Sequence, residues 1–219
     1  MVTVSVPRPA AQCRPRVLAF HPELLHGTPL AQSMRDYTYF SYNANEALHL
    51  SAGERQTIIG CMENIRGELQ SPVFDKHSRP LIVDNVKLLL DYCIRFYDRQ
   101  FTTREKMNND IIARFEALLD DYFRSGKPAT EGLPTVQYCA DKLCLSSNYL
   151  SDLMKRISGE SAKKHIRRKV LETAIGLVTD TARPVSEIAY RLGFQYPQHF
   201  SRWFKQQTGC TPREYRVQL

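Results

Sequence analysis

The spacing of apolar residues predicts three amphipathic helices after residue 50. In each stretch an apolar side chain recurs every three or four residues, as on the buried face of a helix. The three apolar stripes are Ile58, Met62, Ile65 and Leu69, then Ile82, Val86, Leu89, Cys93 and Phe96, and then Ile111, Phe115, Leu118 and Tyr122. Ser51 and Glu54 form a capping-box pattern that starts the first helix, and Ser71 with Pro72 ends it. The second helix starts near Pro80.

The first fifty residues follow a different pattern. Val2, Val4 and Val6 alternate with polar residues, and Tyr37–Tyr42 is an aromatic run (YTYFSY), which is typical of strands. Prolines interrupt the rest of this region. We therefore predict a short strand-containing segment over residues 1–50, too small for a closed barrel, which needs about eight strands.

The first two helices predict an antiparallel hairpin over residues 51–105. Its apolar faces either pack on other elements of this chain or mediate self-association, and the sequence leaves both alternatives open. The third helix covers about residues 108–123, and Ser125–Pro128 (SGKP) is typical of a linker.

The region after this linker contains an approximate internal repeat. At an offset of 49, Val136, Ala140, Leu143 and Leu145 align with Val185, Ala189, Leu192 and Phe194. At an offset of 50, Leu150, Ser151, Met154, Lys155 and Gly159 align with Phe200, Ser201, Phe204, Lys205 and Gly209. Each copy has a short helix, a turn and a second helix, so we predict two helix-turn-helix units at about 134–157 and 184–208. Pro184 opens the second copy and Gly193 supplies its turn.

A further helix, about residues 161–179, lies between the two units. Its buried stripe is Ile166, Val170, Ala174, Leu177 and Val178. At about 1.5 Å per residue it spans roughly 28 Å, whereas successive major grooves on one face of DNA repeat every ~34 Å. A rigid strut of this length fits two reading helices in adjacent grooves of a tandem, non-palindromic site.

The net charge of +7 lies wholly in the region of the repeat. Residues 1–125 carry 15 Lys/Arg and 15 Asp/Glu, whereas residues 126–219 carry 15 Lys/Arg and 8 Asp/Glu. Nucleic acid is the commonest polyanion that such a basic module binds. The strut holds five cations, which are either a solvated helix face or phosphate contacts: Lys163, Lys164, Arg167, Arg168 and Lys169.

Other functional classes find no support in the sequence. There is no run of 18 apolar residues and no apolar signal core at the start, so we expect a cytoplasmic protein without a membrane segment. The 6 cysteines include no CxxC pair and the 6 histidines are scattered, so we expect no metal and no cofactor. No cysteine is paired in sequence with a histidine and an acid, so we expect no enzyme. A thiol sensor at Cys139 or Cys144 is the rival that an oxidant would test.

Residues Ser186–Arg216 (SEIAYRLGFQYPQHFSRWFKQQTGCTPREYR) resemble the signature of the AraC/XylS family. Its parts are a Gly-Phe turn, a Phe-Ser-Arg-x-Phe-Lys helix and a Gly-x-x-Pro-x-x-Tyr-Arg tail. Leu145–Ile166 (LSSNYLSDLMKRISGESAKKHI) is similar to the family's first unit. The resemblance implies a mainly α fold with a seven-helix DNA-binding domain over 106–219. It also implies a regulator of transcription that binds double-stranded promoter DNA, usually an activator that contacts RNA polymerase at the nucleoid.

The resemblance also assigns site residues. The base-facing positions fall on Asn148, Ser151, Asp152, Gln198 and Arg202, with Pro197 at a third position of the second helix and His199 as a weaker candidate. Asn and Gln pair with adenine and Arg with guanine, whereas Asp152 departs from the family pattern and either accepts from cytosine or repels phosphate. The phosphate-facing positions fall on Ser147, Lys155, Lys164, Arg167, Ser201 and Lys205. The aromatic residues Phe200, Trp203, Phe204 and Tyr215 have the spacing of a core.

The N-terminal half is similar to the family only in part. Ser41–Gln56 (SYNANEALHLSAGERQ) and the hairpin resemble the exit of an effector barrel and a dimerisation pair. Most of the barrel has no match, so the chain is either a shortened member or part of a longer protein, and the resemblance does not extend to a small-molecule effector. A homodimer is a further expectation. The alternative function is a dimerising module that titrates a full-length relative.

Overall fold

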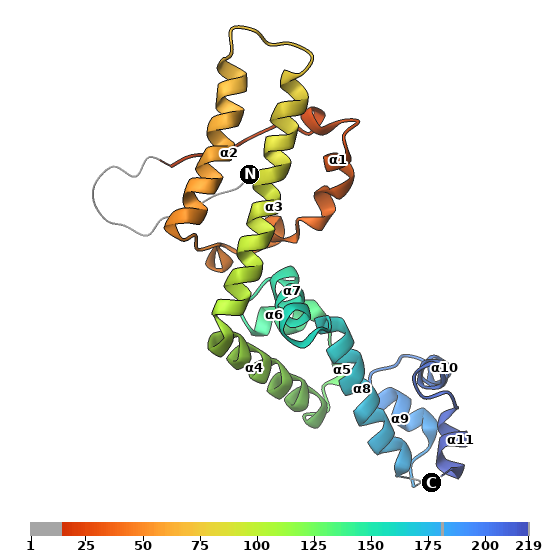
Figure 1. The fold of residues 1–219 in the computed structure, drawn as a ribbon. Coiled ribbons are helices and arrows are strands. Elements are labelled where there is room, and N and C mark those ends of the chain that lie inside the picture. Colours follow the sequence, from red (N-terminus) through yellow and green to blue (C-terminus); the bar gives the residue numbers. More distant parts are fainter. Residues whose placement is uncertain (1–14, 181, 219) are drawn as a thin grey trace. The chain divides into compact units, whose positions relative to one another are not determined.

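The computed structural model describes residues 15–180 and 182–218, and every element in these ranges is helical (Figure 1). The chain divides into two compact units, Met1–Arg104 and Glu105–Leu219. The helices of unit 1 are η1 (Pro22–Leu25), α1 (Pro29–Ser33), η2 (Met34–Asp36), η3 (Thr38–Ser41), η4 (Ala44–Glu46), α2 (Ala52–Gln70) and α3 (Ser78–Thr103), where η marks a 3₁₀ helix. No helix in the described ranges is both long and apolar enough to cross a membrane.

The helices of unit 2 are α4 (Glu105–Arg124), α5 (Pro128–Glu131), α6 (Val136–Lys142), α7 (Ser147–Ser158), α8 (Ala162–Thr179), α9 (Val185–Arg191), α10 (Pro197–Thr208) and α11 (Pro212–Val217). The described part of this unit therefore holds eight helical segments rather than the seven that the resemblance implies, and α5 is a single turn. The mainly α fold is confirmed.

The α2–α3 hairpin starts with the predicted capping box. The Ser51 Oγ accepts from the Glu54 N–H at 3.3 Å, and the Glu54 carboxylate accepts from the Ser51 N–H at 2.8 Å. Arg99 of α3 donates to both carboxylate oxygens of Glu54, at 2.9 and 2.8 Å, and to the carbonyl of His49 at 2.7 Å. The backbone hydrogen bond from Ser51 and this guanidinium hold the pKa of Glu54 below its usual value. The start of α2 is thus fastened to the C-terminal half of α3.

The aromatic run Tyr37–Tyr42 is not a strand, so this prediction was wrong. Thr38–Ser41 is the 3₁₀ helix η3, in which residues three apart lie on the same side. That geometry lets Tyr39 stack on Tyr97 of α3 at 5.5 Å and Tyr42 meet the same ring edge-on at 5.1 Å. In a strand the two rings would point to opposite faces. Val2, Val4 and Val6, the other predicted strand, lie outside the described residues.

The core of unit 1 joins the N-terminal turns to the hairpin. The buried side chains of this core include Leu25, Leu30 and Tyr37 from the turns together with Ile65 of α2 and Leu90 of α3. The hydroxyl of Tyr37 donates to Asp91 at 2.7 Å and fixes the turns to α3. One face of the hairpin therefore packs on elements of this chain, whereas other apolar residues of α3 stay exposed, Leu81 by 45% and Leu88 by 46%.

Unit 2 has two apolar clusters, and residues of α8 belong to both. In Figure 1, α8 runs from the region of α6 and α7 to that of α9 and α11. Ala162, Ile166 and Val170 of α8 belong to the first cluster, which also holds residues of α4, α6 and α7. Ala174 and Val178, further along α8, belong to the second cluster, with residues of α9 and α10. The half-buried Trp203 packs against both clusters. The two helix-turn-helix units therefore share one helix and one indole ring.

The linker between α4 and α6, taken here as residues 125–135, contacts the second helix-turn-helix unit. Gly193 has a φ of 89°, and a Cβ there would lie 2.7 Å from the backbone carbon of Gly132 and 2.7 Å from the carbonyl oxygen of Pro128. Tyr122 of α4 donates to the carbonyl of Gly132 at 2.9 Å, which holds the linker in place. Gly193 is therefore required both for its left-handed backbone and for this close backbone approach.

We predict that Gly193→Ala lowers the free energy of unfolding by about 2 kcal/mol or more, because the methyl group meets backbone atoms and the backbone is left-handed. Urea unfolding followed by circular dichroism measures this change. The matched control is Gly176→Ala within α8, where a Cβ meets nothing within 4 Å. This control should stabilise the protein by up to about 1 kcal/mol, since Ala has the higher helix propensity. Equal urea midpoints for Gly193→Ala and Gly176→Ala would contradict the need for glycine at position 193.

Candidate nucleic-acid interface

The two predicted helix-turn-helix units have the same hydrogen bonds in their turns. The Leu145 N–H donates to the Ala140 carbonyl at 2.9 Å, and the Phe194 N–H donates to the Ala189 carbonyl at 2.9 Å. The residue before each donor is left-handed, Cys144 with a φ of 58° and Gly193 with a φ of 89°. These pairs are 49 residues apart, which is the offset of the sequence repeat, so the repeat is confirmed as a repeat of structure.

The repeat extends beyond the two units that the sequence indicated. Ser158 and Thr208, at the ends of α7 and α10, donate to the carbonyls four residues earlier at 2.7 and 2.9 Å. A left-handed glycine follows each, Gly159 or Gly209. The next helices, α8 and α11, are then capped by the hydroxyls of Ser161 and Thr211. Each repeat therefore holds three helices, and an alignment carried a few residues further at the offset of 50 finds these hydroxyl pairs.

The second helix of each unit buries one side and exposes the other. In α7 the buried residues are Tyr149, Leu150, Leu153 and Met154, and in α10 they are Phe200 and Phe204. Among the predicted base-facing residues, four side chains are exposed and three are half-buried. The exposed ones are Asn148, Gln198, His199 and Arg202, and the half-buried ones are Ser151, Asp152 and Pro197. The polar side of each helix is thus on the surface.

The first turns of α7 and α10 differ. Ser146 caps α7, because its hydroxyl accepts from the Tyr149 N–H at 3.1 Å. The equivalent position before α10 is Tyr196, whose side chain makes no capping hydrogen bond, and Pro197 follows it. Tyr196 is 53% exposed, and its ring contacts His199 edge-on at 5.2 Å. Tyr196 is not among the residues predicted from the sequence, and the signal for it is an aromatic residue at an N-cap position.

The predicted phosphate-facing hydroxyls are engaged within the protein. Ser147 donates its proton to Gln137 of α6 at 2.7 Å, and Ser201 donates to the carbonyl of Pro197 at 3.1 Å. A hydroxyl has one proton, so each of these side chains must rotate before it can donate to a phosphate. The cations Lys155 and Lys205 are exposed and have no ion-pair partner in the described part of the chain.

The five cations of α8 divide between two faces. Lys164 and Arg168 pair with Glu160 at 2.7 and 2.8 Å, and Lys169 pairs with Asp120 of α4. Lys163 and Arg167, one turn apart, form no ion pair among the described residues and line a pocket beside α6 and α10. Residues 161–171 contain no acid, so this stretch of sequence does not predict the ion pairs. Both carboxylates, Glu160 and Asp120, lie outside it.

The comparisons with known proteins agree with this geometry. A family model described as a helix-turn-helix domain matches residues 139–218, which include most of α6 and all of α7–α11. The regulatory protein SoxS of Escherichia coli K12 is 35% identical over 118 residues, a match that covers 53% of this chain and 99% of SoxS. The chain belongs to the AraC/XylS family.

Two further matches, a longer relative and a solved structure, have lower sequence identity to this chain than SoxS has. The transcriptional activator RhaS of Citrobacter koseri is 26% identical over 160 residues, which are 73% of this AraC/XylS chain and 52% of RhaS. The chain thus spans about half the length of RhaS. The C-terminal domain of AraT, a response regulator from Geobacillus stearothermophilus, is 26% identical, with a TM-score of 0.43. That match covers 50% of this chain and 84% of the solved one.

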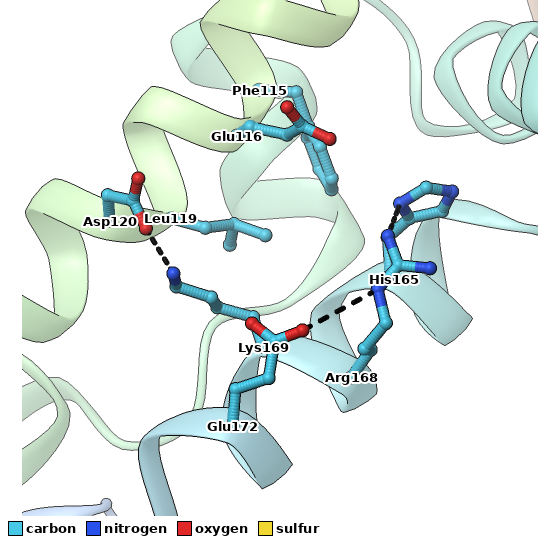
Figure 2. Close-up of a pocket in the computed structure, with 8 residues that line it drawn as sticks. All are labelled: Phe115, Glu116, Leu119, Asp120, His165, Arg168, Lys169 and Glu172. Carbon is cyan, nitrogen blue, oxygen red and sulfur yellow. Dashed lines mark hydrogen bonds and ion pairs between the residues drawn. The ribbon is translucent and has the colours of Figure 1, made fainter. Parts of the chain in front are cut away.

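In this family member a polar network joins the end of α7 to the α4 side of α8. His165 of α8 is buried, and the Arg168 guanidinium donates to its Nδ1 at 2.8 Å (Figure 2). Since arginine only donates, Nδ1 is an acceptor and the ring proton lies on Nε2, which donates to the hydroxyl of Ser158 at 2.7 Å. The network therefore joins the end of α7 to α8 through a neutral imidazole.

Burial holds the pKa of His165 below its ordinary value of 6.5, and the charge of Arg168 adds to this effect. Lys164 also lowers the pKa, whereas the carboxylates of Glu160 and Glu116 raise it without cancelling the effect of burial. Of these residues, His165, Arg168 and Glu116 line a cavity of about 190 Å³ between α4 and α8 (Figure 2). The folded state thus favours the neutral ring.

Of the two thiols in the sensor hypothesis, Cys139 lacks the properties that a sensor needs. Cys139 is buried, and this burial raises its pKa to about 11, so the thiol is protonated near neutral pH. Cys144 is exposed in the first turn. A reactive cysteine needs a lowered pKa and access, and Cys139 has neither.

We predict that the protein loses stability as the pH falls below 6.5, because the unfolded chain then binds a proton on His165 that the folded chain excludes. The measurement is the urea midpoint at about pH 7.5 and about pH 5.5. His165→Gln keeps a donor and an acceptor without titrating, so the difference between the two midpoints should shrink. His26→Gln, at an exposed histidine, is the control and should keep the wild-type difference. An unchanged difference in His165→Gln would refute the role of this ring.

Proposed function

We propose that the chain is a sequence-specific DNA-binding regulator of transcription that reads two adjacent major grooves of promoter DNA with α7 and α10. The observation that carries this proposal is the pair of equivalent helix-turn-helix units on one shared helix, each with an exposed polar side on its second helix. Family membership and the regulatory relatives SoxS and RhaS support it. We further propose a cytoplasmic, nucleoid-bound protein, since promoter DNA is its target.

The length of α8 supports a tandem site. Its 18 residues span about 27 Å at ~1.5 Å per residue, which is comparable with the ~34 Å between successive major grooves on one face of DNA. Its ends are buried in the two apolar clusters, so the helix is held at both units. One polypeptide would then read two half-sites in the same orientation, without the two-fold symmetry of a dimer.

Base readout and backbone contact fall to different residues in this proposal. Arg202 is suited to guanine, Gln198 and Asn148 to adenine, and Asp152 to cytosine. Lys155, Lys205 and Arg167 are the cations for phosphate, because they are exposed and lack ion-pair partners in the described chain. Lys164 must leave Glu160 to take the same role, and Ser147 and Ser201 must rotate. We infer activation, with contact to RNA polymerase, from RhaS, which is named an activator.

We predict that Arg202→Ala weakens binding to the selected operator by about 1–3 kcal/mol and relaxes the preference at one base pair. The operator is first obtained by selecting bound sites from random DNA. Fluorescence anisotropy then compares the variant on the operator and on random duplex. An equal loss on both duplexes would show that Arg202 contacts only the backbone.

Lys205→Ala is the matched comparison from the same helix. Because a phosphate contact is independent of sequence, this variant should weaken both duplexes alike and reduce the slope of log K against log salt by about 1. An unchanged slope would remove Lys205 from the backbone contacts.

The second candidate function is a dimerising module that titrates a full-length relative. The observation that favours it is the exposure of Leu81 and Leu88, two turns apart on α3. If these residues form a homodimer contact, Leu88→Glu should convert a dimer into a monomer in sedimentation equilibrium, since burying a carboxylate is costly. Gln56→Glu, which adds the same charge at an exposed position of α2, should leave the association constant unchanged.

DNA binding separates this candidate from the first. The titrating module needs a stable dimer with weak affinity for the operator, whereas the regulator needs operator affinity as a monomer or a dimer. A monomeric wild-type chain would exclude both the homodimer and the titrating module.

A further inference from the structure

A recess in unit 2 combines apolar walls with two cations that have no ion-pair partner in the described chain. It lies between the start of α6, one side of α8 and the inner side of α10, and has a volume of about 330 Å³. Its apolar walls include Val136, Ile166, Val170 and Trp203, and its cations are Lys163 and Arg167. No Asp or Glu is among the described residues that line it.

The positions of these side chains follow from the helix period. Lys163 and Arg167 are four residues apart on α8, so they lie on one face, one above the other. Ile166 and Val170, 7% and 3% exposed, form a parallel row on the same helix and belong to the core. The recess therefore has an apolar floor that is built into the fold, with a positive charge at two levels along one side.

We propose that this recess binds a small amphipathic carboxylate, whose hydrocarbon body lies against Val136, Ile166, Val170 and Trp203 and whose carboxylate pairs with Lys163 and Arg167. Its volume is at the lower end of the range for ligand pockets, about 300–1,000 Å³, which are mostly apolar with a few placed polar groups. Two unpaired cations call for an anion by charge complementarity, and a carboxylate pairs with a guanidinium through two hydrogen bonds.

A DNA phosphate alone does not explain this recess. A phosphate would pair with the two cations, but the sugar-phosphate backbone is polar and leaves the apolar walls in contact with water. A hydrocarbon body removes this apolar surface from water, at about 25 cal/mol per Å². The apolar walls thus favour a ligand with a hydrocarbon body, a feature that the two cations alone do not require.

The site also gives a route to regulation, and this part rests on the proposed function. Arg167 is one of the cations that we assign to DNA phosphate, so a bound carboxylate and the DNA backbone use the same guanidinium. The ligand and the operator should therefore compete, and the ligand should weaken DNA binding.

Trp203 makes the site directly observable, because it is the single tryptophan of the chain. We would titrate the full chain, without DNA, with octanoate below its micelle concentration and follow tryptophan fluorescence. Isothermal titration calorimetry gives a second, independent readout. Octan-1-ol, which has the same hydrocarbon body without the charge, is the ligand control.

We expect a saturable signal with octanoate and binding at least about tenfold weaker with octan-1-ol, which corresponds to ~1.4 kcal/mol. Arg167→Gln and Lys163→Gln should each weaken octanoate by about tenfold, while Arg114→Gln, which removes one exposed charge from α4, should leave it unchanged. Absence of saturation in both fluorescence and calorimetry would overturn the site. Equal binding of the alcohol, or an equal loss in Arg114→Gln, would also overturn it.

The competition has its own experiment. Operator binding is measured with saturating octanoate and with sodium chloride at the same ionic strength. We expect a weaker apparent affinity only with octanoate, and no difference between the two salts would overturn the shared use of Arg167. A chain that binds octanoate but shows no operator preference would overturn the proposed function and leave the carboxylate site standing.

Discussion

Unit 2 depends on the burial of one side of α8. The first half of this side, from Ala162 to Val170, closes the cluster under the first helix-turn-helix unit, and the second half, at Ala174 and Val178, closes the cluster under the other. Neither helix-turn-helix unit has a complete core without α8. Burying a large aliphatic side chain contributes about 1.5–3 kcal/mol, so the hydrophobic effect that folds each unit also sets the distance between them.

The exposed side of α8 carries five cations, which fall into two groups. Three of its five cations are neutralised by Glu160 and Asp120, and they brace α8 against the turn after α7 and against α4. Surface ion pairs contribute little to stability, about 0–1 kcal/mol each, so their effect is mainly on orientation. The two remaining cations, Lys163 and Arg167, border the apolar recess instead. The basic excess on the exposed strut is therefore smaller than the count of its lysines and arginines implies.

Local rules predicted the elements that local interactions build. The capping box of Ser51 and Glu54 and the turn at Gly193 follow from neighbouring residues. The helical period alone places Phe200 and Phe204 on the buried side of α10. The same rules failed for Tyr37–Tyr42, whose rings at Tyr39 and Tyr42 pack on Tyr97, a residue distant in sequence. The hydroxyl of Ser147 and the charge of Lys169 are likewise decided by Gln137 and Asp120 on other helices. The polar side of α10 was predicted, and the recess beside it was not, because three helices form it.

The two left-handed turns make the repeats unequal in a way that their hydrogen bonds do not show. Cys144 holds its turn with an exposed side chain, whereas Gly193 holds the equivalent turn against the backbone of Gly132. The side chain of the first turn can therefore vary, whereas in the second turn two backbone segments are in direct contact. A side chain at position 193, as at Cys144, would place its Cβ 2.7 Å from the backbone carbon of Gly132 and 2.7 Å from the carbonyl oxygen of Pro128. The two repeats thus share the same hydrogen-bonded turn, but the backbone contact at Gly193 makes the second turn specific to its position in the chain.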